Sequence, residues 1–197
     1  MSKEQIAFWG AGGLSARVST VETKTTLNEE NIILLNQQVH SLEIAVFPQV
    51  YGSFSSTQTQ PIPDAGSGVA LTYDTTDIAN ECVLVGIPNA PLVQVGFTGV
   101  YRILFSLQLN RSGGSIGSIY AYPVVGGTPV PNSTTKMSIN NNQEDCLTVE
   151  YILSLTADEP FGINCYSPSA GQEALAIPAT VDYPAVPSVI LTLNRIA

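Results

Sequence analysis

The chain has 197 residues, of which 44% are hydrophobic and 12% charged, and its net charge is −9. This composition is typical of one packed domain with an appendage and is too apolar for a disordered protein. The acidic balance opposes binding to phosphate backbones, and no run of about 18 apolar residues is present. Nucleic acid is therefore not an expected partner, and a membrane-spanning helix is excluded.

The first 17 residues are predicted to be an attachment arm. They lack a basic region followed by an apolar one, so a cleaved secretion signal is not expected. They do contain the large apolar residues Ile6, Phe8 and Trp9 close together. Apolar side chains near a chain terminus suit docking onto another protein.

A heptad pattern runs through residues 18–46. The first seam position holds Val18, Thr25, Ile32, Val39 and Val46, and the second holds Val21, Asn28, Leu35 and Leu42. β-Branched residues at the first position and Leu at the second are typical of parallel coiled coils. We therefore predict that a helix in this region forms an oligomer interface through Ile32, Leu35, Val39 and Leu42.

The start of this helix and its partner are less constrained by the pattern. Thr26 and Glu29 have the spacing of a capping box, which predicts that the firm part of the helix begins at Thr26. The alternative to a coiled coil is a single amphipathic helix that lies against the following domain. Either way, residues 1–46 form the arm and helix, and residues 47–197 form a head domain.

The head begins a series of strand patterns separated by turns. Strands are expected at 50–56, 69–73, 82–85, 92–97, 99–110, 116–125, 128–130, 135–139, 147–155, 161–166 and 188–194, with loops at 57–68 and 167–187. Gly126 and Gly127 are a preferred pair for a two-residue hairpin. Pro123 is expected at a sheet edge or a bulge, because proline lacks the backbone donor.

The clearest strand covers residues 99–110. One side of an extended chain holds Tyr101, Ile103, Phe105, Leu107 and Leu109, and the other side is polar except for Leu104. Residues 147–155 alternate in the same way, with Ile152 as the exception. Many short strands without interleaved helices predict an all-β, antiparallel jelly-roll sandwich of two four- or five-stranded sheets.

Three cysteines lie in strand-like runs, Cys82, Cys146 and Cys165. We expect buried free thiols, with a Cys146–Cys165 disulfide as the alternative. Their spacing does not resemble a zinc site.

The chain is not expected to be an enzyme or to need a cofactor. Its one histidine, His40, lies outside the head, so nucleophile–histidine pairs and histidine metal clusters are not available there. Carboxylate pairs at 144–145 and 158–159 are expected in solvated turns, where the alternative role is calcium binding. No sugar-sized cleft for acid catalysis is indicated.

The tyrosines are the remaining candidates for recognition. Tyr101 and Tyr151 share the spacing of buried neighbours and are expected in the core. Tyr120, Tyr122 and Tyr166, and also Tyr183, lie nearer to turns. Because amphipathic rings are favoured where proteins meet, we predict that the first three belong to an oligomer interface, and packing in the core or in loops is the alternative for each.

The order of these strands resembles a known family. The carrying segments are Tyr-Gly-Ser-Phe-Ser-Ser-Thr at 51–57, Gly-Val-Tyr-Arg-Ile-Leu-Phe-Ser-Leu-Gln-Leu at 99–109, Val-Pro-Asn-Ser at 130–133, Leu-Thr-Val-Glu-Tyr-Ile-Leu-Ser-Leu at 147–155 and Pro-Ser-Val-Ile-Leu-Thr at 187–192. They resemble the C1q/TNF-like jelly-roll heads of structural proteins in tailed phages and large DNA viruses. The resemblance covers residues 50–196. It departs from the family in the almost uncharged segment 119–125.

The resemblance implies a ten-strand sandwich that associates as a trimer, or as a pentamer at a capsid vertex. It implies a virion structural protein, a capsid vertex component or a spike or fibre head, whose partners are other virion proteins. The alternative is an adhesin head that recognises a host glycan or protein through loops 57–68, 110–115 and 167–187. The absence of tryptophan from the sequence of residues 47–197 disfavours a sugar-binding platform.

Overall fold

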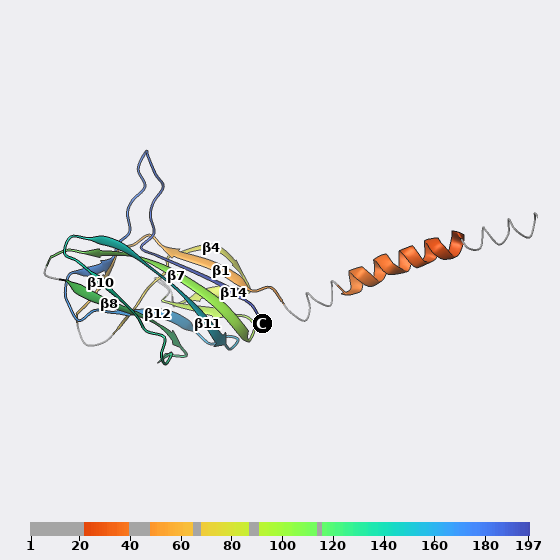
Figure 1. Cartoon of the computed structure of the whole chain (residues 1–197), viewed down its shortest axis with the longest axis horizontal. Helices are drawn as coiled ribbons and strands as arrows, with labels where there is room; N and C mark the ends of the chain where they lie inside the picture. The colour runs from red at the N-terminus through yellow and green to blue at the C-terminus, as the bar shows by residue number, and fades with distance from the viewer. Residues whose placement is uncertain (1–21, 40–47, 65–67, 87–90, 114–115) are drawn as a thin grey trace, which may run out of the picture. The chain divides into compact units, whose positions relative to one another are not determined.

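The computed structural model describes residues 22–39, 48–64, 68–86, 91–113 and 116–197 (Figure 1). The chain divides into two compact units, Met1–Pro48 and Gln49–Ala197, and we call the second unit the head. In the first unit, residues 22–39 are helical. None of the described helical residues form a segment with the length and hydropathy needed to cross a membrane.

The described part of the head consists of two seven-stranded antiparallel sheets. Sheet 1 contains β1 (Tyr51–Ser56), β2 (Gln60–Ile62), β4 (Thr75–Asn80), β7 (Gly99–Arg111), β11 (Glu144–Leu155), β13 (Gln172–Ala174) and β14 (Val189–Arg195). Sheet 2 contains β3 (Val69–Ala70), β5 (Cys82–Val85), β6 (Leu92–Val95), β8 (Gly117–Val125), β9 (Thr128–Pro129), β10 (Thr135–Ile139) and β12 (Phe161–Tyr166). The predicted all-β, antiparallel sandwich is confirmed.

Strand β7 organises sheet 1. One of its edges pairs with β11 over its length, from Gly99 opposite Leu155 to Asn110 opposite Glu144. Its other edge pairs first with β14 and then with β13. A 13-residue strand can take two shorter partners end to end, because every second side chain on one face is apolar and needs the same cover.

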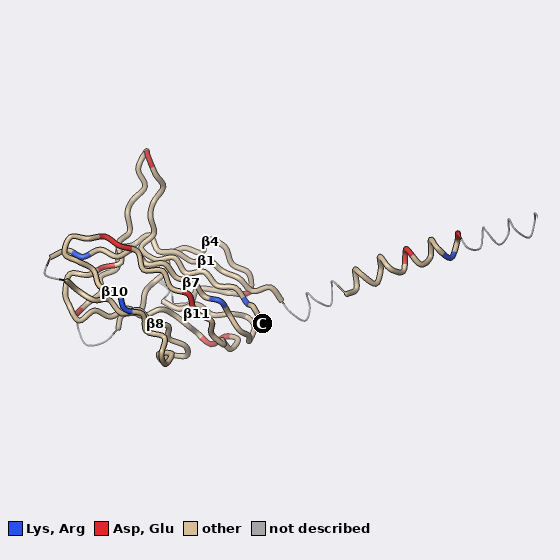
Figure 2. The backbone as a smooth tube through the Cα atoms, viewed as in Figure 1, with Lys and Arg blue, Asp and Glu red and all other residues tan. Residues whose placement is uncertain are grey.

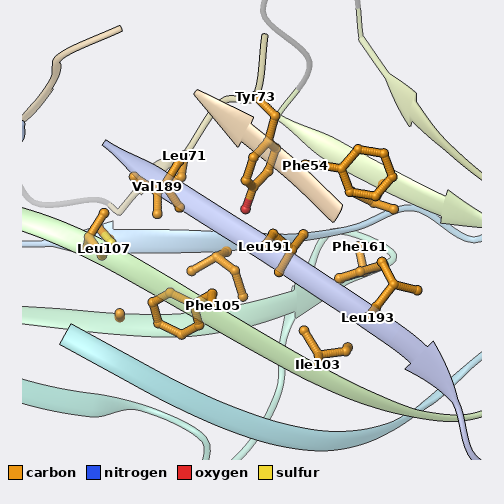
Figure 3. Packing of buried hydrophobic residues seen from close by; sticks show 14 of the residues in the cluster. Phe54, Leu71, Tyr73, Ile103, Phe105, Leu107, Phe161, Val189, Leu191 and Leu193 are labelled. Carbon is orange, nitrogen blue, oxygen red and sulfur yellow. The ribbon is translucent and has the colours of Figure 1, made fainter. Parts of the chain in front are cut away.

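The two sheets pack their apolar faces against each other. Sheet 1 contributes Phe54, Ile103, Phe105, Leu107, Val189, Leu191 and Leu193, and Phe161 comes from sheet 2 (Figure 3). The alternating residues predicted from β7 are all buried, and Phe105 is 0% exposed. Each such side chain contributes roughly 1.5–3 kcal/mol through burial, so this layer is the main source of the head's stability.

The glycine pair forms the predicted hairpin, but the prediction for Pro123 was wrong. Val125 pairs with Thr128 across Gly126 and Gly127, whose φ values are +55° and +79°, as a two-residue turn of this kind requires. Strand β8 is not an edge, because β12 lies on one side and β10 and β9 on the other. The Pro123 carbonyl accepts a hydrogen bond from the Val130 N–H, so the Pro123 nitrogen points to the same side, towards the residues between β9 and β10. No described strand pairs with Pro123 on this side of β8, so the N–H that proline lacks does not cost a hydrogen bond between strands.

The sheets contain more strands than predicted. The prediction missed several strands because they are too short or too polar to show a pattern in the sequence. The expected loops contain β2 and β13, which pair with each other, and each is only three residues long. Strand β4 was not predicted at all. It pairs with β1 at the edge of sheet 1, and its mostly exposed side chains give no alternation of apolar and polar residues.

The helix does not begin at Thr26, contrary to the prediction. The described helix already includes residue 22, and the Thr26 hydroxyl donates to the Glu22 carbonyl at 3.1 Å. This is the bond that a Thr makes one turn back inside a helix. A capping role would have required Thr26 to stand outside the first turn.

Candidate interaction surfaces

The helical seam is exposed along the described part of the first unit. Ile32 and Leu35 are each 59% exposed and Val39 is 46% exposed. They recur on one side of the helix at the spacing of the predicted heptad. Leu42 and the attachment residues Ile6, Phe8 and Trp9 lie outside the described residues.

Apolar exposure in this helix is not confined to the seam. Leu27, Ile33 and Leu34 are also exposed and occupy other heptad positions. Every residue in 22–39 is exposed. A helix with this much uncovered apolar surface gains little from folding alone, because most helical stability in proteins comes from packing.

The outer face of sheet 1 is a second surface with uncovered apolar side chains. Leu104 on β7 is 38% exposed and Ile152 on β11 is 63% exposed, and Ile190 on β14 lies on the same face. Leu104 pairs with Glu150, so Ile152 is its diagonal neighbour. These two residues are the exceptions in the alternation of their strands, and that signal could have located this surface from the sequence.

Polar groups accompany these apolar residues on the same face. Arg102 donates to Glu150 at 2.6 Å, and both side chains are exposed. The hydrogen bond to Glu150 and then its charge raise the pKa of Arg102. A shallow hollow of about 160 Å³ is lined by Arg102, Leu104, Thr192 and Asn194. The face therefore combines apolar contact area with groups that can set orientation.

The three tyrosines predicted for an interface come together on the outer face of sheet 2. Tyr120 and Tyr122 project from β8, and Tyr166 from β12 is the register partner of Tyr120. The rings of Tyr120 and Tyr166 have centroids 6.0 Å apart and are tilted by 36°. Together with Gly68 and Thr134 they line an open hollow of about 300 Å³, which we call the tyrosine site.

Two neighbours define the shape and charge of the tyrosine site. A Cβ atom at Gly68 would lie 2.1 Å from the Tyr122 hydroxyl, so a larger residue at this position would have to displace the end of the Tyr122 side chain. The ammonium of Lys136 on β10 lies 5.7 Å from the centroid of the Tyr120 ring. A cation at this distance from an aromatic face is held there electrostatically.

The cysteines were predicted to be buried, and this was wrong for Cys146. All three thiols are free, but Cys146 is exposed on the outer face of sheet 1, beside the hydroxyl of Ser106 at 3.2 Å. It falls on the polar side of the β11 alternation. Burial raises the pKa of the Cys165 thiol to about 12, so this group stays protonated and is not a nucleophile.

The two carboxylate pairs singled out in the sequence lie in different local structures. Glu144 and Asp145 lie in β11 rather than in the predicted turn. Asp158 is in a turn with φ +61°, and it lines a hollow of about 340 Å³ with Glu81. Among the described residues, no group of three or more His, Cys, Asp and Glu side chains could hold a metal ion.

Asp74 has a structural role. Its carboxylate accepts from the Thr57 backbone N–H at 3.0 Å and from the Thr57 hydroxyl at 2.7 Å, and also from the Thr75 hydroxyl. Partial burial raises the pKa of Asp74, but these hydrogen bonds outweigh it, and the pKa lies below its ordinary value. The carboxylate fastens the end of β1 to the start of β4.

Comparison with known proteins identifies similar structures but no sequence relatives. No family model and no curated protein matches the chain. Murine APRIL is 8% identical with a TM-score of 0.48, covering 75% of this chain and 99% of that chain. The Eiger TNF from S. frugiperda is 10% identical with a TM-score of 0.47, covering 77% and 94%.

The globular domain of the zebrafish complement 1qA protein is likewise similar. It is 10% identical with a TM-score of 0.46, and the match covers 75% of this chain and 98% of that chain. The similarity is one of fold alone. The antiparallel two-sheet class of the head rests on its own strand pairing.

Proposed function

We propose that the chain is a non-enzymatic, self-associating structural head, mounted on a virion through its N-terminal segment. The observation that carries self-association is the exposed seam of the helix, with Ile32, Leu35 and Val39 uncovered at heptad spacing. The virion setting is supported by the resemblance of residues 50–196 to viral jelly-roll heads.

Association is driven by the apolar surface that single copies leave in water. Burying it contributes roughly 25 cal/mol per Å², from which the cost of immobilising the partners is subtracted. Leu104, Ile152 and Ile190 give the head an apolar area that copies joined by their helices can cover. Closed symmetry then limits the assembly to a fixed number of copies.

The copy number follows from which surface dominates. The resemblance of the head favours three copies, or five at a capsid vertex. β-Branched residues at the first seam position with Leu at the second favour two helices in a parallel coiled coil. The mass of the full-length oligomer separates these outcomes.

The test uses two double variants of the full-length chain that are matched in chemistry. I32N/L35N places two Asn side chains in the seam, whereas I33N/L34N makes the same two exchanges at exposed positions outside it. We expect the seam variant to sediment at a lower mass than the wild type, shifted towards the 20.9 kDa chain mass, and the control to keep the wild-type mass. A monomeric wild type, or equal losses in both variants, would contradict the proposal.

The proposed location on a virion requires a separate measurement. Particles purified from the source by density gradient should contain the chain at a fixed ratio to the major capsid protein, measured by quantitative mass spectrometry. The I32N/L35N variant should be depleted from particles more than I33N/L34N. Absence of the wild-type chain from particles would overturn the virion role while leaving self-association intact.

A further inference from the structure

A projecting hairpin leaves the head between β13 and β14. Residues 177–186 form its two legs, and it is the blue hairpin that rises from the head in Figure 1. Ile177 and Val186 exchange both backbone hydrogen bonds at 2.9 Å, and the Thr180 N–H donates to the Tyr183 carbonyl at 2.9 Å. Val181 at the tip is 101% exposed, and Tyr183 is 46% exposed. No hairpin residue belongs to the buried core, and all of residues 178–185 are exposed.

The hairpin is rigid enough to present that surface in one shape. The Thr180 hydroxyl accepts from the N–H groups of Asp182 and Tyr183 at 3.2 and 3.3 Å, which closes the tip. Pro178 and Pro184 fix the backbone torsion in each leg. A segment that is ordered before binding loses less entropy when it docks.

The tyrosine site has the lining that accepts such a segment. Proteins bind proline-rich chains in grooves walled by aromatic rings, where ring faces pack on proline rings. The end of the hairpin reads Pro184-Ala-Val-Pro187, with two prolines at the spacing such grooves take. The hollow between Tyr120, Tyr122 and Tyr166 is about 300 Å³, at the lower end of the ~300–1,000 Å³ typical of ligand sites. It suits one or two side chains rather than a large ligand.

The two surfaces are also complementary in charge. Asp182 at the tip is the single charged residue within 177–186, and Lys136 beside Tyr120 is the single lysine of the head (Figure 2). In the part of the chain that the structure describes, the one ion pair is Arg102 with Glu150, so neither group is used in one. Lys136 therefore offers the positive charge that would attract Asp182 of a docking hairpin.

We propose that the hairpin of one copy docks into the tyrosine site of another copy, with Asp182 of the hairpin meeting Lys136 of the site. We take a second copy as the source of the hairpin because one chain carries both the exposed tip with Asp182 and the site with the oppositely charged Lys136. The contact joins two different surfaces and is therefore heterologous, which builds rings or chains of heads. This contact goes beyond the proposed function. It rests on the proposed function in one respect, because it takes a second copy of the chain as the partner.

The first test reverses each charge in the full-length chain. D182K and K136D, studied separately, should each associate at least about tenfold more weakly than the wild type. In each variant alone, residues 182 and 136 carry charges of the same sign and repel each other across the contact. An equimolar mixture of D182K and K136D should restore association, since every hairpin then meets a site of opposite charge. D64K is the control for D182K, because it makes the same change of net charge at an exposed loop residue and should leave association unchanged. Sedimentation velocity over a concentration series is the readout.

The second test traps the contact directly. A carbodiimide reagent joins an amine to a carboxylate that touches it, and the head has one lysine, so a cross-link from its Lys side chain starts at Lys136. In an equimolar mixture of ¹⁴N- and ¹⁵N-labelled protein, we expect Lys136–Asp182 peptides with one light and one heavy half. D182N should abolish that peptide.

The outcomes separate this contact from the proposed assembly. If I32N/L35N abolishes the oligomer that the helices form while the mixed-isotope peptide persists, the hairpin contact is supported and the helical contact is not needed for it. If that oligomer forms but D182K, K136D and D64K behave alike and no mixed peptide appears, the hairpin contact is overturned. Binding of an added glycan at the tyrosine site with no such peptide would likewise overturn it in favour of an adhesin role.

Discussion

Phe105 in the head and Leu35 in the helix are both large apolar residues placed by a regular pattern, and their exposures are 0% and 59%. In the head, a pattern of period two meets a second pattern of the same kind, because two sheets face each other within one chain. In residues 22–39, a pattern of period seven has no such partner among the described residues of the first unit. Periodicity in the sequence therefore shows where an apolar face lies, while only the fold shows whether the same chain covers that face.

The largest expected effect tests whether the head carries its own stability. F105A should lower the free energy of unfolding by about 3–5 kcal/mol, because it leaves a cavity between the sheets. L104A, the next residue on the outer face, should change it by less than about 1 kcal/mol. Urea unfolding followed by the near-ultraviolet circular dichroism of the tyrosines measures both. Similar losses would mean that the outer face is packed as tightly as the core.

The next prediction tests whether the helix needs a partner. A peptide of residues 18–46 should show little helix when dilute and more as its concentration rises, because a lone helix is marginal in water. The peptide with I32N/L35N should stay unfolded throughout. Far-ultraviolet circular dichroism over a hundredfold range of concentration is the measurement. Full helicity at every concentration, with a monomeric mass, would remove the contrast between the two units.

Two buried tyrosines sharpen the account of the core. The Tyr73 hydroxyl is buried with no protein partner, whereas the Tyr101 hydroxyl donates to the Phe97 carbonyl at 2.6 Å. Burial raises the pKa of Tyr73 far above its ordinary value. Y73F should therefore raise the free energy of unfolding by about 1 kcal/mol, and Y101F should lower it by about 1 kcal/mol. Thermal unfolding of both proteins gives the sign, and equal signs would contradict the contrast.

The smallest expected effect is a dependence of the head's stability on acid. The pKa of Asp74 is lower in the folded head than its ordinary value of 3.8. Its contribution is therefore present above that value and is lost as the pH falls through the folded pKa. The difference in melting temperature between wild type and D74N should shrink as the pH is lowered from 6 to 2.5. A constant difference would show that the Thr57 contacts do not depend on the charge.

The sequence was informative wherever one strand carries its own pattern. The alternation from Tyr101 to Leu109 predicted the buried face of β7, and Gly126 with Gly127 predicted the hairpin. Both depend on local physics, the pleat of a strand and the positive φ of a turn. The polar edge strand β4 and the three-residue strands β2 and β13 depend on distant partners, and no local pattern marks them.

The interaction surfaces divide in the same way. Tyr120 and Tyr122 alternate with buried Ile119 and Ala121, so their outward direction is written in the strand. Their meeting with Tyr166 and Lys136 depends on how β12 and β10 register against β8, which the sequence does not display. The hairpin at 177–186 was assigned to a loop because its prolines hide the pairing of its legs.

The pairing of β1 with β14 has a practical consequence for engineering. Tyr51 lies opposite Asn194, and the Arg195 N–H donates to the Val50 carbonyl at 2.9 Å, so the start and the end of the head lie side by side on two neighbouring strands of sheet 1. A short linker from residue 197 to residue 49 would close the head into a circle, and new termini could then be opened at the hairpin tip near Val181. Reporters or antigens fused at residue 197 would lie beside the start of β1, whereas the same cargo at new termini near Val181 would lie at the exposed tip of the hairpin.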